Sequence, residues 1–146
     1  MKIKISTPQA IVFEDEIKQI TIPTESGSLL INKIKPLVKT IIPWLITILP
    51  DFPPQNNSYI IKNNEIMLSI DKGMIFVDET MIRIVSSNAT ITPTESESHL
   101  LEKKQHIEEE MKQMRIYGSI EDQERIINKL GKINADILLE HTKQTI

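Results

Sequence analysis

The stretch MIRIVSSNATITPTESESHL, residues 81–100, contains the change of pattern that decides the fold. Up to residue 85, the apolar residues come in short runs broken by turn residues, as they do in β-strands. From Thr92 onward they fall at helical spacing. Residues 86–88 are polar and read as a linker. We therefore expect a β module at residues 1–88 and a helical module at residues 92–146.

The β module is predicted from a series of short apolar runs separated by turn residues such as Asn63-Asn64, Asp71-Lys72-Gly73 and Asp78-Glu79. About ten short strands at this spacing favour a flattened β-sandwich. The runs occupy residues 2–5, 11–13, 17–22, 29–31, 41–49, 59–61, 66–70, 74–77 and 81–85. Residues 50–57 are expected to be a loop, because their prolines cannot enter the interior of a sheet.

The helical module is predicted to be an antiparallel hairpin, which makes the fold class α+β. TPTE at residues 92–95 matches a capping pattern and places the first helix start there. Gly118 is expected to end this helix, and Ser119 precedes a second one. Because few residues separate the helices, they should fold back on each other with their apolar stripes in contact. These stripes consist of Leu100, Ile107, Met111 and Met114 in the first helix and of Ile126, Leu130, Ile133 and Ile137 in the second, widened there by Ile127 and Leu138.

The most apolar stretch of the chain, residues 37–50, contains Lys39 and Pro43 and is shorter than the roughly 20 residues that span a bilayer. Two buried strands that meet at Pro43 are the favoured interpretation. An exposed apolar contact surface, which Trp44 would suit, is the alternative. The first nine residues lack the apolar segment of a signal peptide, so export by that route is not expected.

Composition excludes several classes of function. The chain has 146 residues, no cysteine and a net charge of −3, which rules out thiol chemistry and disfavours nonspecific binding to nucleic acid. The three histidines, His99, His106 and His141, lack metal-ligand spacing. Residues 108–110 are three glutamates, but consecutive helical residues point in different directions and do not form a catalytic pair. No catalytic residue, cofactor or metal site is therefore predicted.

Several motifs resemble the epsilon subunit of F-type ATP synthases, in order and over nearly the whole length of the chain. The opening of that family is similar to KISTP at residues 4–8, VFEDEI at 12–17 and TIPTESG at 21–27. Further matches are Pro36-Leu37, GMIFV at residues 73–77 and IRIV at residues 82–85. Phe76 replaces a polar strand position of the family and is expected to lie in the core, with a place in an interface as the alternative.

The resemblance implies a β-sandwich with a C-terminal helical hairpin and a mechanical role. Such a subunit links the gamma subunit to the membrane ring in the central stalk, and its helices can contact the catalytic head and restrain ATP hydrolysis. We accordingly expect a non-enzymatic rotor subunit that couples ion translocation to ATP synthesis. It would be peripheral, on the cytoplasmic face of the energy-transducing membrane, and held there by its partners.

The same resemblance implies two sets of contact residues. Ring-facing contacts are expected at Glu25, Ser26, Gly27, Ser28, Asn32 and Lys33. Contacts of the hairpin with acidic segments of the head are a second role that the resemblance offers for its basic side chains, whereas ordinary helix-surface ion pairs are the favoured role. These side chains are Lys103, Lys104, Lys112, Arg115, Arg125, Lys129 and Lys132. The ATP-binding pattern of some members contains an aspartate and an arginine that are missing from ESESHL at residues 95–100, so ATP sensing is not expected.

Two other classes of function remain open from the sequence. The first is a free-standing β-sandwich binding module with a helical oligomerisation tail, which predicts a stable homo-oligomer. The second is a regulator that senses a small ligand, which predicts that a ligand stabilises the isolated chain against heat.

Overall fold

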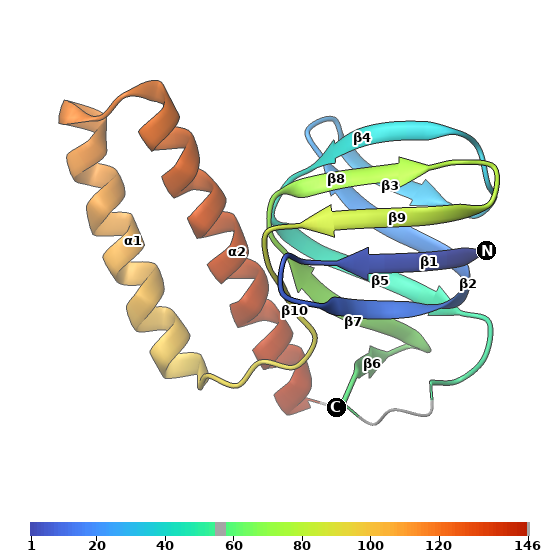
Figure 1. The fold of residues 1–146 in the computed structure, drawn as a ribbon. Helices are drawn as coiled ribbons and strands as arrows, with labels where there is room; N and C mark the ends of the chain where they lie inside the picture. Colours follow the sequence, from blue (N-terminus) through green and yellow to red (C-terminus); the bar gives the residue numbers. More distant parts are fainter. Residues whose placement is uncertain (55–57, 146) are drawn as a thin grey trace.

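The computed structural model describes residues 1–54 and 58–145, and within α1 it does not describe the side chains of residues 115–117. The predicted loop at residues 50–57 is wrong at Pro50, which is the last residue of a strand and pairs with Ile17, and its residues 55–57 lie outside the described residues. Figure 1 shows a β-sandwich beside two helices, with α2 next to the sandwich and α1 on its outer side. The strands are β1 (Lys2–Ser6), β2 (Ile11–Thr24), β3 (Gly27–Ile31), β4 (Leu37–Ile41), β5 (Trp44–Pro50), β6 (Ile60–Lys62), β7 (Glu65–Ile70), β8 (Gly73–Val77), β9 (Met81–Ser86) and β10 (Ala89–Thr90). The helices are α1 (Glu97–Tyr117) and α2 (Ile120–Thr145).

One long strand joins the layers of the sandwich. The residues expected to form two strands, 11–13 and 17–22, form the single strand β2, which pairs with β1 through its first half and with β3 and β5 through its second half. At its end, Thr24 pairs with Ile41 of β4. The strand order β1-β9-β8-β4-β2, together with the β1–β2 pairing, closes the sheet on itself, and β5, β7 and β10 continue from β2. Such closure leaves few free strand edges.

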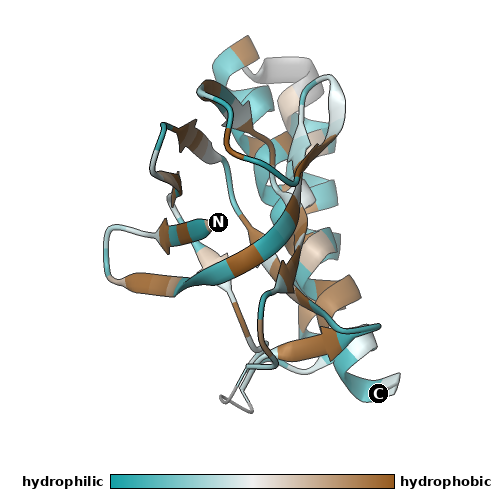
Figure 2. Cartoon of the chain, turned by 90° about the vertical axis from the view of Figure 1, so that its right-hand side faces the viewer, coloured by the Kyte–Doolittle hydropathy of each residue, from teal (hydrophilic) through white to brown (hydrophobic). Residues whose placement is uncertain are grey.

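The core consists of strand residues, most of them isoleucines. Ile3 and Ile5 of β1 and Ile82 and Ile84 of β9 are fully buried, and the residues between them point outward. Figure 2 shows the resulting alternation of apolar and polar residues along the strand that begins at the N-terminus. β-Branched side chains suit such positions because they pack well on a pleated sheet. The predicted sandwich followed by a helical hairpin is confirmed.

Helix α1 begins later than the capping pattern indicated. Its N-cap is Ser96, whose hydroxyl accepts a hydrogen bond from the backbone N–H of His99, so the predicted start at residues 92–95 is wrong. Tertiary contacts hold this segment outside the helix: the Thr92 hydroxyl donates to the Ser58 carbonyl, and Lys143 Nζ donates to the carbonyl of the buried Pro93 at 3.2 Å. The predicted end holds, because α1 stops at Tyr117, directly before Gly118.

The buried side of helix α2 matches the expected stripe only in part. Ile126 and Ile133 are buried as predicted, but Ile127 and Leu138 are 58% and 39% exposed, so their assignment to the stripe is wrong. The reason is that α2 contacts α1 and also β5, β6 and β7, which extends its buried arc in another direction. The buried residues that the stripe omitted are Lys132, Ala135, Leu139, Glu140 and Thr142.

The polar run after β9 is not a free linker. Ser86 is buried at the end of β9, and its hydroxyl lies 2.9 Å from the carbonyl oxygens of Asp71 and Asn88. Ala89 and Thr90 then pair with β7 as β10. The sheet thus extends to residue 90, and the division into modules at residues 1–88 and 92–146 stays a prediction.

Candidate functional site: an exposed sheet face and a docked hairpin

An apolar patch covers the outer surface of β4, β8 and β9. We call it the apolar face and define it as Val38, Met74, Phe76 and Val85, which are 37–61% exposed. The strand register places them side by side, with Val38 opposite Phe76 and Met74 opposite Val85. Four apolar side chains in adjacent strands, where alternation would place polar ones, are typical of a surface that binds a partner.

Phe76 corrects one expectation from the sequence. It was predicted to lie in the core, but it is 41% exposed. Its neighbours Ile75 and Val77 occupy the inward positions of β8, so strand alternation directs Phe76 outward. A hollow of about 430 Å³, lined by Pro8, Phe76 and other residues, adjoins the apolar face.

A polar turn borders the apolar face. Between β8 and β9, the Asp78 carboxylate accepts hydrogen bonds from the backbone N–H and hydroxyl of Thr80 and from the backbone N–H of Met81. These bonds lower the pKa of Asp78 to about 2. The positive charge of Arg83, whose Nη2 lies 3.3 Å from Asp78 Oδ2, lowers it further in the same direction. The patch therefore has a charged rim, as protein interfaces commonly do.

The residues expected to face a membrane ring lie at the two ends of β3. Glu25, Ser26, Gly27 and Ser28 are exposed at the turn between β2 and β3, where Gly27 has a φ of +113° that favours glycine. The Thr24 hydroxyl donates to the Gly27 carbonyl at 2.6 Å and fixes this turn. Asn32 and Lys33 are also exposed, but they follow the other end of the strand. The set therefore does not form one continuous turn, and its contact with a ring stays a prediction.

The basic side chains of the hairpin fall into three groups. Lys103, Lys104 and Arg125 make ion pairs with Glu95, Glu108 and Asp122. The Lys103 hydrogen bond, at 2.6 Å, lowers the pKa of Glu95. Lys112 and Lys129 are exposed, and the side chain of Arg115 lies outside the described residues. Lys132 is only 7% exposed, so it is not a surface residue in this arrangement.

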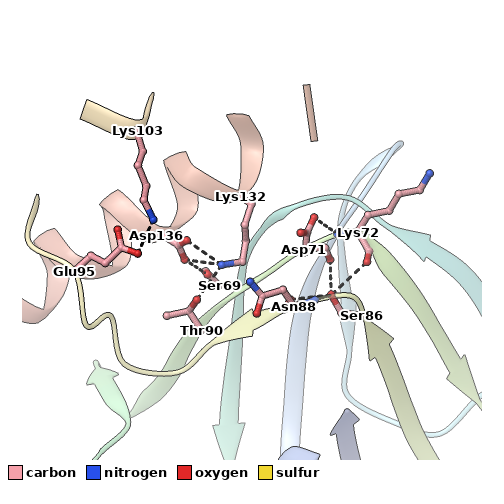
Figure 3. Close-up of polar contacts among 10 residues, drawn as sticks. All are labelled: Ser69, Asp71, Lys72, Ser86, Asn88, Thr90, Glu95, Lys103, Lys132 and Asp136. Carbon is pink, nitrogen blue, oxygen red and sulfur yellow. Dashed lines mark hydrogen bonds and ion pairs between the residues drawn. The ribbon is translucent and has the colours of Figure 1, made fainter. Parts of the chain in front are cut away.

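Lys132 belongs to a polar cluster that the sequence reading missed. Figure 3 shows its ammonium group between Asp136 of the same helix and Thr90 of β10, with Ser69 of β7 beside the carboxylate. The sequence held one signal for this cluster, since Lys132 and Asp136 are four residues apart and can pair along a helix. The positions of Ser69 and Thr90 could only be known from the fold.

Metal binding and membrane crossing can be assessed in the part of the chain that the structure describes. No group of three His, Cys, Asp or Glu side chains there could hold a metal ion. His99 Nε2 lies 3.3 Å from Glu95 Oε2, and His141 Nδ1 lies 3.8 Å from Glu97 Oε1. None of the described helices is long and apolar enough to cross a membrane.

Comparison with known proteins gives matches at the level of structure. No family model matches the chain, and no curated protein matches its sequence. A chain in the cryo-EM structure of the Euglena gracilis mitochondrial ATP synthase, OSCP/F1/c-ring in rotational state 1, matches with a TM-score of 0.66 at 13% identity, covering 91% of this chain and 76% of that one. The likeness is one of fold.

A second structure matches over most of both chains. A chain in the cryo-EM structure of the central stalk and c-ring of the Tetrahymena thermophila mitochondrial ATP synthase matches with a TM-score of 0.59 at 12% identity, covering 96% of each chain. The sandwich and the hairpin are therefore both parts of the shared fold. In this chain, α2 packs on β5, β6 and β7, whereas the apolar face on β4, β8 and β9 stays uncovered.

Proposed function

We propose that this chain is a rotor subunit in the central stalk of an F-type ATP synthase, corresponding to the epsilon subunit. The observation that carries the proposal is the uncovered apolar face on a sandwich-and-hairpin fold, which has counterparts over 91% and 96% of this chain in two ATP synthase structures. A sandwich that leaves Val38 61% exposed and Phe76 41% exposed has an unsatisfied surface, which a permanent partner would bury. The gamma subunit is the partner that we assign to this surface.

In this proposal, the subunit acts through its surfaces and not as an enzyme. The apolar face packs on gamma, and the turn at Glu25, Ser26, Gly27 and Ser28 meets the polar loops of the membrane ring, with Asn32 and Lys33 extending that contact. Torque then passes between ring and gamma through the closed sheet, whose buried isoleucines make it resist deformation. The subunit is held at the membrane as a peripheral component through these partners, on the cytoplasmic face.

The hairpin has a second proposed role, which is to contact the catalytic head transiently and restrain ATP hydrolysis. Lys103, Lys104, Lys112, Arg115, Arg125 and Lys129 would meet acidic segments of the head. Lys132 can join them only if α2 leaves the sandwich, because its side chain is buried there. Deleting residues 92–146 should then raise ATP hydrolysis by the assembled complex, and an unchanged rate would remove the inhibitory role.

An affinity pull-down tests the rotor assignment. The tagged chain is isolated from its own cell membranes, washed with salt, and its partners are identified by mass spectrometry. Recovery of gamma, catalytic-head and ring subunits in constant proportion is expected. Recovery of the chain alone or bound only to itself would overturn the assignment and favour a free-standing binding module whose apolar face meets a second copy.

A further inference from the structure

Helix α2 turns charged residues inward and apolar residues outward. Lys132 and Glu140 are each 7% exposed, whereas Ile127 is 58% exposed. A surface helix of a globular protein usually does the opposite, with its apolar stripe on the core and its charges in water. The outward apolar residues of α2 are therefore a surface whose use the packing of this chain does not explain.

These outward residues form one line along the helix, which we call the α2 stripe. It consists of Ile120, Ile127 and Leu138, which are 77%, 58% and 39% exposed. At about 100° per residue, the three side chains point within about 20° of one another. No Asp, Glu, Lys or Arg of α2 (Ile120–Thr145) falls within about 40° of Ile127. An exposed apolar line without charges is typical of a surface that binds a partner.

Helix α1 adds an apolar residue to the same side of the hairpin. The two helices lie side by side (Figure 1), and His141 Nδ1 of α2 is 3.8 Å from Glu97 Oε1 of α1. Leu138 lies one turn before His141, and Leu101 lies one turn after Glu97, so both leucines share the side of this ion pair. Leu101 is 48% exposed. The exposed apolar surface therefore extends over both helices.

The α2 stripe is complementary to itself. A second α2 can lie antiparallel on the first, around a twofold axis midway between Ile127 and Leu138. Ile127 of each copy then meets Leu138 of the other, and every contact occurs twice, as in other twofold interfaces. Because the stripe is uncharged, no like charges face each other. A charged partner surface would instead lose its hydration against the stripe without gaining a counterion.

We propose that the α2 stripe is a self-association surface, through which two free copies of this chain form a twofold symmetric dimer. The apolar face on β4, β8 and β9 takes no part in it and stays open. Helix α2 has 26 residues, and one pair of helices buries less than the standard interface of about 1,600 Å². The dimer is therefore weak and reversible, with a dissociation constant in the micromolar range. This inference does not rest on the proposed function.

Sedimentation velocity of the purified full-length chain, from micromolar to millimolar concentration, tests the dimer. The parent chain should form a reversible dimer. Ile127→Glu and Leu138→Lys should each weaken it at least about tenfold, because each substitution places a charge against an apolar side chain twice per dimer. The double variant Ile127→Glu/Leu138→Lys should associate more tightly than either single variant, since each new carboxylate meets a new ammonium group of the other copy. This recovery tests the antiparallel register as well as the stripe.

Two control variants separate the stripe from other apolar surfaces. Leu30 of β3 is 52% exposed, so Leu30→Lys makes the same kind of change as Leu138→Lys outside the stripe and should leave the dimer unchanged. Phe76→Thr, on the apolar face, should also leave it unchanged. Circular dichroism confirms that each variant is folded.

Three results would overturn the inference. The first is a parent chain that stays monomeric at every concentration, which would assign the stripe to a different protein. The second is a dimer that Leu30→Lys or Phe76→Thr weakens as much as Leu138→Lys does. The third is a double variant that associates no better than the single ones. Because the sample contains no other protein, the outcome is independent of whether the chain binds gamma.

Discussion

Replacing Phe76 by threonine tests whether the apolar face is the surface that holds gamma. Phe76 is 41% exposed, and a phenylalanine presents about 200 Å² in all, so a partner could bury about 80 Å² more of it. At about 25 cal/mol per Å², this burial contributes about 2 kcal/mol, or about 30-fold in affinity. Because buried area converts incompletely into affinity, we expect gamma binding to weaken about 5- to 30-fold.

Titration calorimetry with purified gamma measures the change, and a second variant controls for nonspecific loss of apolar surface. Threonine keeps the β-branched shape that strands favour, so the stability of the free chain should change by less than about 1 kcal/mol. Leu101 of α1 is 48% exposed and lies outside the apolar face, and Leu101→Gln should leave binding unchanged. Equal affinities of Phe76→Thr and the parent chain would refute the assignment of gamma to this face.

Three further predictions concern turns of the sandwich. Gly73→Ala should lower the free energy of unfolding, measured in urea, by about 1–3 kcal/mol. The reason is that an added Cβ would lie 2.2 Å from the Val85 carbonyl oxygen. An unchanged urea concentration at the midpoint of unfolding would contradict this packing. Asn64 has a φ of 65°, so Asn64→Val should cost about 1–2 kcal/mol in the same assay, while Asn64→Gly should be tolerated. Hydrogen bonds from Thr80 lower the pKa of Asp78 from 3.8 to about 2. Its folded-state pKa thus lies below the unfolded value, so its stabilisation is complete above pH 3.8 and is lost as the pH falls through about 2. The melting temperature should fall less steeply over this range in Asp78→Asn, and parallel curves would exclude the role of these bonds.

The sequence predicted most of the strands, the hairpin and the break at Gly118 because these depend on short-range patterns. Alternation of apolar residues indicates a strand, and apolar residues at helical spacing indicate a helix. Both patterns can be recognised without knowing which element packs against the segment. It failed at Thr92–Pro93, where a sound capping pattern is overridden by contacts with Ser58 and Lys143 that come from distant parts of the chain. It also failed at Phe76. Alternate residues of β8 face inward, and a shift of one residue would exchange the inward and outward sets, so the fold decides on which side Phe76 lies.

The candidate surfaces divide in the same way. Exposed turns such as the one at Gly27 could be located from composition, since φ near +113° requires glycine and turns lie at the surface. The apolar face could not, because it joins Val38, Met74 and Val85 from three strands whose register is set by pairing.

What the sequence determined by itself was the kind of most segments and the residue types that are present, among which cysteine is absent, since local backbone preference is carried by neighbouring residues. What only the tertiary structure decided was which side of each segment is covered. Lys132 reads as a surface cation in the sequence and is buried in the fold, because Ser69 and Thr90 arrive beside it from β7 and β10. Burial is a property of the assembled layers, so the desolvation of the Lys132–Asp136 ion pair exists only after those layers have packed.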